Sequence, residues 1–437
     1  MYLPPQVQFC ISALENAGFA AYAVGGCVRD ACLGLTPQDY DLCTAAAPEE
    51  ICAVFAGFPL VKAGEKHGTI GVVMDGAVYE ITTFRTEGGY ADSRHPDWVA
   101  FVPDVNLDLA RRDFTVNAMA YSPTRGFADP FGGRADLESQ VLRAVGDPDL
   151  RFTEDALRIL RGARFSVKYG LSPETETFRA MLQLAPRLQN IAAERIFDEL
   201  CKLLPLLKAD DLAVFAPILT QILPELAPTV GFDQKNSHHR YDVYTHSAHV
   251  VEAVPATLSL RWAALLHDVG KPACFSLDLQ GKGHFYGHAK QSAQMAAQIL
   301  RRLKAPNVLR EEVVQLVELH MTKIEPEKKV VRRWLSRLGE EGLTSLLLLQ
   351  EADMSGKGTG RPAETVQFSQ IRALLAEIQA ENACLSIKGL AINGHDLMAI
   401  GITGPAIGRT LNALLEQVMD ETLPNEKEAL LAAAKQL

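Results

Sequence analysis

The most constraining feature of this sequence is the stretch VGGCVRDACLGLTPQDYDLCT at residues 24–44. The apolar run FAAYAVG, which overlaps its start, predicts a buried strand that ends at a pair of glycines. The next residues, CVRDACLG, predict a helix ending at Gly34, and YDLCT predicts a second strand. A chain that alternates strand, tight turn, helix and strand within so few residues is expected to begin with a mixed α and β domain.

Two groups in this stretch suit the chemistry of phosphates. The Gly25–Gly26 turn exposes backbone N–H groups with no Cβ, and such a turn at a helix start can cradle phosphate oxygens. Asp39 and Asp41 are two apart, so in an extended strand their carboxylates point to the same face. Paired carboxylates with substrate phosphates commonly hold Mg²⁺. A simple tight turn and a polar loop are the alternatives, but the two features together favour a nucleotide site.

The rest of the chain divides into a part with strands and a helical part. TIGVVMDGAVYEITTF (69–84) predicts a hairpin, whereas from RFTEDALRILRGARFSVKYG (151–170) onward the apolar spacing is helical. With 437 residues, of which 48% are hydrophobic, the chain can bury a large core in several domains. Polar stretches at 231–240 and 355–362 indicate domain boundaries.

The composition also limits the classes of protein. No apolar run reaches transmembrane length and the N-terminus has no signal-peptide pattern, so we expect a cytoplasmic protein without a membrane partner. Eight cysteines without CxxC spacing indicate reduced thiols. The net charge of -10 does not indicate nucleic-acid binding, although residues 151–168, with five basic and two acidic side chains, can provide a local positive surface.

A second candidate site lies in EDALRILRGARF (154–165). If this segment is one continuous helix, Asp155 and Arg158 share a face, and Arg161 and Arg164 continue it at the same spacing. A carboxylate accepts hydrogen bonds and a guanidinium donates them, so the pair could recognise the edge of a base without a template strand. The alternative is an ordinary salt bridge on a solvated helix face.

A third candidate site is rich in histidine. Eight of the eleven histidines fall between residues 238 and 320. The order His246, His267–Asp268 and Asp353, with His288 between, would bring imidazoles and carboxylates together from separate helices. Such ligands suit a divalent transition metal that activates water, although the metal's identity stays open. Buried structural histidines, or a site that no longer turns over, are the alternatives.

These motifs resemble those of the class II tRNA nucleotidyltransferases, the bacterial CCA-adding enzymes and their poly(A) polymerase relatives. GGCVRD…DYD, RRDFTVNAMAY (111–121), DPFGGRADL (129–137), EDALRILRGARF and ERIFDELCKLL (194–204) match the family's motifs in order. INGHDLMAIGITGPAIGRTLNALLEQV (392–418) is similar to its C-terminal part. The histidine pattern, and HDVGKP above all, resembles the HD phosphohydrolase superfamily.

The resemblance implies an α+β fold in four parts. An N-terminal nucleotidyltransferase palm with a mixed antiparallel sheet (1–150) would precede an all-α neck that selects the nucleotide and contacts RNA (151–230). An HD metal-dependent domain (231–360) and a helical body and tail for tRNA (361–437) would follow. HD-containing relatives make a homodimer as conceivable as a monomer.

The resemblance also implies the activity, which is template-independent addition of CCA to the 3′ end of tRNA from CTP and ATP with release of pyrophosphate. Asp39 and Asp41 would bind Mg²⁺ and be catalytic, and the turn at Gly25 would hold the triphosphate. His246, His267, Asp268 and Asp353 would hold a second metal and support phosphohydrolase activity. A nucleotide-contact role carries over to Gly26, Arg29, Arg112, Asp155, Arg158, Arg161 and Arg164.

Alternatives to this activity remain. In the family, a loop at the position of residues 85–101 is associated with addition of A, so its length here argues against an enzyme that adds CC alone. A second hypothesis is that the protein is a poly(A) polymerase or an A-adding enzyme of the same family. A third is an HD phosphohydrolase whose N-terminal part only binds nucleotide or RNA.

Overall fold

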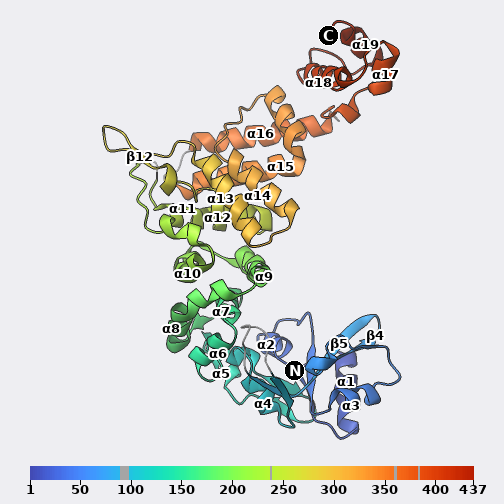
Figure 1. Ribbon diagram of the computed structural model, residues 1–437, viewed down its shortest axis with the longest axis vertical. Helices are drawn as coiled ribbons and strands as arrows, with labels where there is room; N and C mark the ends of the chain where they lie inside the picture. The colour runs from blue at the N-terminus through green and yellow to red at the C-terminus, as the bar shows by residue number, and fades with distance from the viewer. Residues whose placement is uncertain (89–97, 237–238, 359–361, 382–383) are drawn as a thin grey trace. The chain divides into compact units, whose positions relative to one another are not determined.

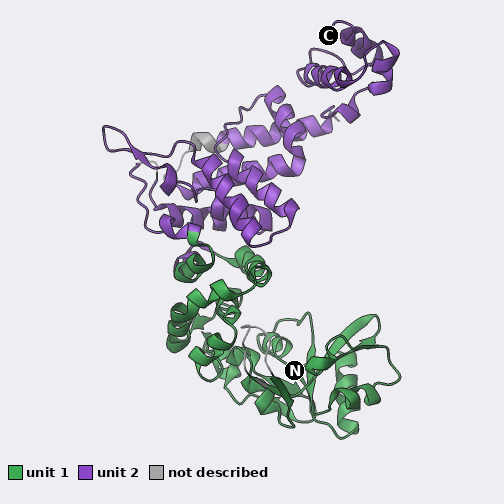
Figure 2. Ribbon diagram, viewed as in Figure 1, with its two compact units in different colours: residues 1–207, 214–224 green, residues 208–213, 225–437 purple. Residues whose placement is uncertain are grey.

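The computed structural model describes residues 1–437 except 89–97, 237–238, 359–361 and 382–383. The chain forms two compact units, one of residues 1–207 and 214–224 and the other of residues 208–213 and 225–437 (Figure 2). Strands with helices make up the first part of the chain and helices nearly all the rest, which confirms the predicted α+β class. The division into four functional parts stays a prediction.

The first unit is built on a seven-stranded sheet with the order β3-β4-β5-β2-β1-β8-β9. Two of its strands, β4 and β5, are labelled in Figure 1. Its neighbouring strands pair antiparallel, except for β2 and β5, which are parallel, so the sheet is mixed as predicted. The strands of the sheet are β1 (Ala21–Val24), β2 (Asp41–Thr44), β3 (Leu60–Val61), β4 (Thr69–Met74), β5 (Ala77–Thr83), β8 (Ala120–Ser122) and β9 (Gly126–Ala128).

Helices and one further hairpin accompany this sheet. All four residues of β1 are buried, in agreement with its apolar sequence, and the core around it includes Phe84, Leu109 and Val145. The helices are α1 (Pro5–Asn16), α2 (Gly26–Cys32), α3 (Pro48–Val54), α4 (Val105–Ala110) and α5 (Gly133–Glu138). The segment predicted as a loop is instead a hairpin at its two ends, β6 (Arg85–Gly88) and β7 (Trp98–Phe101), and its residues 89–97 lie outside the described residues.

Left-handed backbone conformations mark the two predicted turns. Gly25, between β1 and α2, has φ +77°, and Asp75 and Gly76, between β4 and β5, have φ values of +50° and +79°. Two consecutive residues with positive φ are what a tight two-residue hairpin turn requires, and Asp-Gly tolerates that conformation. The local sequence therefore fixes both chain reversals.

The helical segment that follows is interrupted where the sequence predicts continuity. The helix α6 (Pro148–Glu154) ends before Asp155, whose φ of -143° and ψ of 103° are extended, and α7 (Leu157–Tyr169) begins two residues later. The Asp155 carboxylate accepts a hydrogen bond from the Leu157 amide at 3.0 Å, so it competes with continuation of the helix. The first unit continues with β10 (Val141–Leu142) paired with β11 (Ser172–Pro173), α8 (Thr175–Leu184), α9 (Ala193–Leu203) and most of α10 (Ala209–Ile222).

The second unit is helical apart from a short hairpin. Long α15 is interrupted at Gly339, which has φ +70° inside the helix, and a separate apolar cluster forms around Leu397, Leu414 and Leu430 near the C-terminus. Its elements are α11 (Val243–Ala253), α12 (Leu258–Leu266), β12 (Ser276–Leu277), β13 (Gly283–His284), α13 (His288–Arg302), α14 (Asn307–Leu319), α15 (Lys328–Gly356), α16 (Pro362–Ala380), α17 (Gly394–Ala399), α18 (Pro405–Met419) and α19 (Lys427–Ala434).

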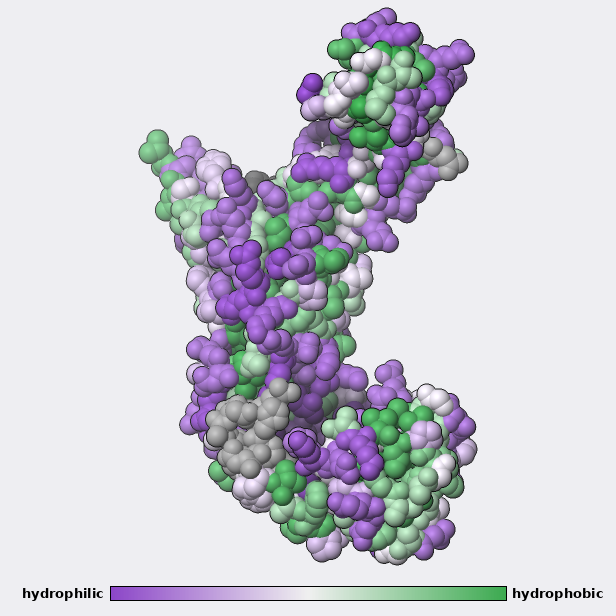
Figure 3. Space-filling model, turned by 45° about the vertical axis from the view of Figure 1, so that its right-hand side comes forward, coloured by the Kyte–Doolittle hydropathy of each residue, from purple (hydrophilic) through white to green (hydrophobic). Residues whose placement is uncertain are grey.

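The distribution of residues on the surface and the state of the cysteines agree with the expectations from composition. Hydrophilic and hydrophobic residues are interspersed on the face shown in Figure 3. Among the helices of the described residues, none has both the length and the apolar character needed to cross a bilayer. All eight cysteines are free thiols, as predicted, and Cys10, Cys27 and Cys43 are buried.

Candidate nucleotide site and candidate metal centre

A cavity of about 880 Å³ in the first unit is lined by most of the residues predicted for the nucleotide site. Its lining comes from α2, from the segment before β2, from the chain after α4 and from α7. Segments more than a hundred residues apart in sequence therefore share one cavity. Nine of the ten residues predicted for this site line it: Gly26, Arg29, Asp39, Asp41, Arg112, Asp155, Arg158, Arg161 and Arg164.

Gly25, the tenth residue, is required by the close approach of an arginine. A Cβ at position 25 would lie 2.7 Å from Nη1 of Arg112, which is closer than real Cβ contacts, and the positive φ adds strain for any other residue. The Gly25 amide donates to the Met119 carbonyl at 2.9 Å, which fixes the turn to the neighbouring chain. Gly25 thus lets Arg112 reach the cavity next to the turn.

The two carboxylates of the predicted magnesium site both line the cavity. Only Asp41 belongs to β2, because the strand begins there; Asp39 lies in the segment before it. Desolvation in the cavity raises the pKa of Asp41 although its side chain is accessible to solvent; the charge of Asp39 adds to this effect, and Arg112 opposes it. Two like charges in one cavity favour a bound cation, and a pair of carboxylate oxygens fits the ligand preference of Mg²⁺.

Asp155 and Arg158 line the same cavity but do not pair on one helix face, so that prediction is wrong. Asp155 sits in the break before α7 and accepts from Nη2 of Arg195 on α9 at 2.7 Å. Arg158 donates instead to the Glu154 carboxylate at 2.7 Å and to the Arg111 carbonyl at 3.2 Å. The helix break separates the directions of the two side chains, and partners from elsewhere hold each of them.

Two further arginines of α7 are also held by carboxylates. Arg161 pairs with Asp113 at 2.7 Å, and Arg164 pairs with Glu199. Burial alone would raise the pKa of Asp113, but the charge of Arg161 and a hydrogen bond from Asn117 outweigh it and lower the pKa to about 2. These pairs keep the guanidinium groups in fixed positions at the cavity wall.

Arg29 is fixed by aromatic and amide contacts. Its guanidinium lies 4.2 Å from the ring centroid of Tyr169, and its Nη1 donates to Oδ1 of Asn117 at 2.5 Å. Stacking and a directed hydrogen bond together restrict the side chain to one orientation. Arg29 therefore presents a positioned positive charge rather than a mobile one.

Several residues of this cavity were not anticipated from the sequence. Asp113 and Asn117 lie four apart in RRDFTVNAMAY, a spacing that could have marked them, since Asn117 donates to Asp113 at 3.0 Å. Arg195 had no such local signal, because its partner Asp155 is 40 residues away. Tyr169 was read only as part of the α7 pattern.

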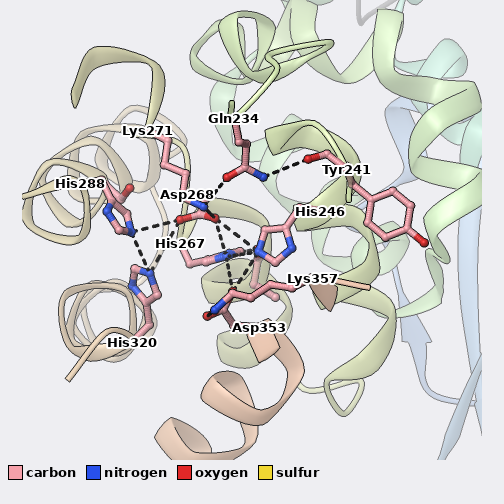
Figure 4. A network of polar contacts seen from close by, with 12 residues as sticks. Gln234, Tyr241, His246, His267, Asp268, Lys271, His288, His320, Asp353 and Lys357 are labelled. Carbon is pink, nitrogen blue, oxygen red and sulfur yellow. Dashed lines mark hydrogen bonds and ion pairs between the residues drawn. The ribbon is translucent and has the colours of Figure 1, made fainter. Parts of the chain in front are cut away.

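The histidine-rich cluster assembles in the second unit as predicted (Figure 4). His246 comes from α11, His267 and Asp268 follow α12, and Asp353 comes from α15. One ligand atom from each of these four residues lies within 4.8 Å of the others, and all four side chains are buried. The distances include 2.9 Å from Nε2 of His246 to Oδ1 of Asp353 and 3.1 Å from Nε2 of His267 to Oδ2 of Asp268.

Burial and neighbouring charges shift several pKa values in this cluster. Burial alone would lower the pKa of His267, but the neighbouring carboxylates, Asp268 first, raise it to about 9. Burial opposes ionisation of Asp268 as well, yet His267 and Lys271 lower its pKa well below the usual value. Burial lowers the pKa of His320 to about 3, with His267 adding to the effect.

His320 is the residue of this region that sequence reasoning missed, and His288 was noted without a role. Their Nε2 atoms lie 3.3 Å apart, and that of His288 is 3.3 Å from Oδ1 of Asp268. His288 begins α13 and His320 follows α14 directly. Neither lies in a local motif such as HDVGKP, so only the tertiary structure shows that they join the cluster.

Comparison with known proteins places this architecture in a class. The family model described as a poly(A) polymerase head domain matches residues 21–143, and the model for an RNA- and SrmB-binding site of polymerase A matches residues 170–229. A third model, for domain 2 of tRNA nucleotidyltransferases, matches residues 284–434. The fold is thus that of a nucleotidyltransferase with a poly(A) polymerase-type head.

Relatives that match over nearly the whole chain identify the family. CCA-adding enzymes of Limosilactobacillus fermentum and Streptococcus thermophilus are each 35% identical, over 98% and 99% of this chain and 95% and 97% of theirs. The crystal structure of the Bacillus stearothermophilus CCA-adding enzyme in complex with CTP matches with a TM-score of 0.74 and 29% identity, covering 100% of this chain and 98% of that one. This chain belongs to the CCA-adding enzyme family.

Proposed function

We propose that this protein adds C, C and A to the 3′ end of tRNA, using CTP and ATP and releasing pyrophosphate. The observation that carries the proposal is the single cavity in the first unit that contains both the Asp39–Asp41 pair and the side chains of α7. A phosphoryl-transfer centre and a base-recognition surface must lie in one cavity if an enzyme is to select a nucleotide without a template. The family membership and the names of the relatives support the same activity.

The residues divide into roles according to their chemistry. Asp39 and Asp41 would hold Mg²⁺, which supplies charge neutralisation at the triphosphate and at the attacking 3′-hydroxyl. The turn at Gly25 would bring the backbone of Gly26, at the start of α2, close to phosphate oxygens, and Arg112 would contribute a guanidinium beside them. In-line attack of the hydroxyl on the α-phosphorus then breaks its bond to the pyrophosphate.

Base selection falls to side chains that are already oriented. Asp155 is held by Arg195, and Arg161 is held by Asp113, so acceptor and donor groups keep fixed places on the cavity wall. Prepaired groups of this kind lose little conformational entropy on binding a base edge. Arg29, Arg158 and Arg164 complete the positive lining that would hold the phosphates and the RNA end.

Nucleotide incorporation tests this proposal. Labelled CTP and ATP are supplied with Mg²⁺, separately and together, to tRNA transcripts that end before CCA, after C and after CC. Ordered addition of two C and one A supports the proposal. Addition of A only to the CC-ending transcript would make the protein an A-adding enzyme, and long ATP-only tails would make it a poly(A) polymerase.

The buried cluster in the second unit favours a second activity. We propose that His246, His267, Asp268 and Asp353 hold a divalent metal ion and support hydrolysis of phosphate esters. Four contacts between imidazole and carboxylate groups join these residues in a buried site, and ligand sets that combine imidazole with carboxylate suit transition metals. Retained CTP incorporation with loss of hydrolysis in an Asp268→Ala variant would show that the two activities are separate.

A further inference from the structure

Polar contacts in the cavity of the first unit form a continuous chain that begins and ends on α7. Arg29 of α2 donates from Nη1 to Oδ1 of Asn117 and from Nη2 to the hydroxyl of Tyr169, both at 2.5 Å. Asn117 donates in turn to Oδ1 of Asp113 at 3.0 Å, and Arg161 pairs with Asp113 at 2.7 Å. Tyr169 and Arg161 both belong to α7, so the chain of contacts ties this helix to α2 at two places.

The two helices joined in this way carry the two halves of the proposed nucleotide site. The helix α2 starts at Gly26, directly after the turn at Gly25 that Arg112 approaches. The helix α7 carries Arg158 and Arg161, which line the same cavity. A nucleotide has a fixed distance between its phosphates and its base, so an enzyme that holds both needs a fixed spacing between the two helices.

The guanidinium of Arg29 is committed to partners within the protein. Its side chain is buried, and Nε donates to Asp30 at 2.8 Å, in addition to the contacts of Nη1 and Nη2. Tyr169 is half-buried at the cavity wall, and its ring centroid lies 6.1 Å from that of Phe165 in a stacked arrangement. Arg29 is therefore oriented by neighbouring side chains, of which Tyr169 is itself held in place by packing.

The two ends of the chain of contacts differ in strength. At one end, Nε and Nη2 of Arg161 both donate to Oδ2 of Asp113, at 2.9 and 2.7 Å. At the other end, a neutral phenol accepts one hydrogen bond, and its ring lies 4.2 Å from the guanidinium carbon of Arg29. Opposite charges attract in addition to their hydrogen bonds, whereas the phenol offers one hydrogen bond and stacking. Tyr169 is therefore the end at which the link is expected to be weaker.

We propose that Tyr169 is a positioning residue that holds Arg29 and thereby keeps α7 at a fixed spacing from the helix that follows the glycine turn. The inference rests on the nucleotide addition proposed above and adds a residue to it. Because a misplacement of about 1 Å can cost about a hundredfold in rate, loss of this contact should slow the chemical step. Binding of CTP should change little, since Tyr169 acts through Arg29.

Single-turnover CTP incorporation by the full-length protein tests this role. The rate at saturating CTP and the CTP concentration for half the maximal rate are measured for Tyr169→Phe, which loses only the hydroxyl, and for Tyr169→Leu, which also loses the aromatic ring. We expect the rate to fall about tenfold and about a hundredfold respectively, with the half-saturating concentration within about twofold of wild type. Tyr121→Phe on β8, whose ring centroid lies 4.7 Å from that of Phe127, is the matched control and should change neither quantity.

A double variant shows whether Tyr169 acts through Arg29. Tyr169→Phe combined with Arg29→Met should lose no more activity than Arg29→Met alone. Additive losses, an unchanged rate in Tyr169→Phe, or a change confined to the half-saturating concentration would each overturn the inference. Circular dichroism reports folding, and Tyr169→Phe decides if Tyr169→Leu does not fold. A wild-type protein that incorporates no nucleotide would instead overturn the proposed nucleotide addition, and this inference with it.

Discussion

The cavity of the first unit and the cluster of the second both contain carboxylates, but these carboxylates differ in their exposure to solvent and in their neighbouring residues. Asp39 and Asp41 are accessible to solvent and offer only two protein ligands, whereas Asp268 and Asp353 are 1% and 5% exposed and lie among histidines. In the proposed metal sites, the first arrangement would need the phosphates of a substrate to complete the coordination of the ion. The second would supply nearly all of its ligands before any substrate arrives, so its metal affinity would depend on the fold.

The largest effect separating the two regions is expected from Asp41→Asn. Removing one carboxylate of the pair leaves the triphosphate charge without its cation, which we expect to lower CTP incorporation by at least about 10³-fold, as several kcal/mol of charge stabilisation implies. Metal binding by the second unit should be unchanged. Glu49→Gln, an exposed carboxylate of α3, is the control, and a comparable loss there would contradict the assignment.

The next effect concerns nucleotide choice in the first unit. Arg195→Ala removes the partner that holds Asp155, so discrimination for CTP and ATP against UTP and GTP should fall by about 100-fold, within the range of one misplaced bidentate contact. Competitive incorporation of the four nucleotides measures this ratio. Arg179→Ala, which breaks the surface pair with Asp149, should leave the ratio unchanged. An unaltered ratio in the Arg195 variant would remove Asp155 from base selection.

A stability effect tests the ion pair behind α7. The pKa of Asp113 is lowered to about 2, so its pairing with Arg161 stabilises the folded state fully above the ordinary carboxyl pKa of 3.8, and this stabilisation is lost as the pH falls through about 2. Asp113→Asn should therefore cost about 2 kcal/mol at pH 7, and the difference from wild type should shrink between about pH 4 and pH 2. Urea unfolding followed by circular dichroism measures it. A difference independent of pH would refute the ion pair as the cause.

The smallest expected effect sharpens the contrast in metal binding. Because the second unit holds its ligands in advance, Mn²⁺ at ten times its dissociation constant should add about 1.4 kcal/mol, or about 3–6 °C, to its melting transition. Without nucleotide, the first unit should not respond. Differential scanning calorimetry with and without chelator measures this effect. A rise in the melting temperature of the first unit alone would contradict the prediction.

The sequence correctly predicted those features of the fold that depend on interactions between residues close in sequence. The strand, glycine turn and helix at residues 21–32 and the Asp75–Gly76 hairpin depend on neighbours in sequence, and the structure has them where predicted. The break at Asp155 was missed because helical spacing continues through it, while a side-chain bond to the Leu157 amide ends the helix. His320 and Arg195 were missed because their partners lie 30 or more residues away, where no periodicity connects them.

The contact between Gly25 and Arg112 limits which substitutions this sequence can accept. A methyl group at position 25 would lie 2.7 Å from Nη1 of Arg112, so an alanine there would displace the guanidinium from its place beside the turn, and the φ of +77° would strain its backbone. Neither position can change first without loss of the cavity's charge or of the turn. Two residues 87 positions apart in sequence thus behave as a single inherited unit, and libraries that vary one of them alone should yield few active clones.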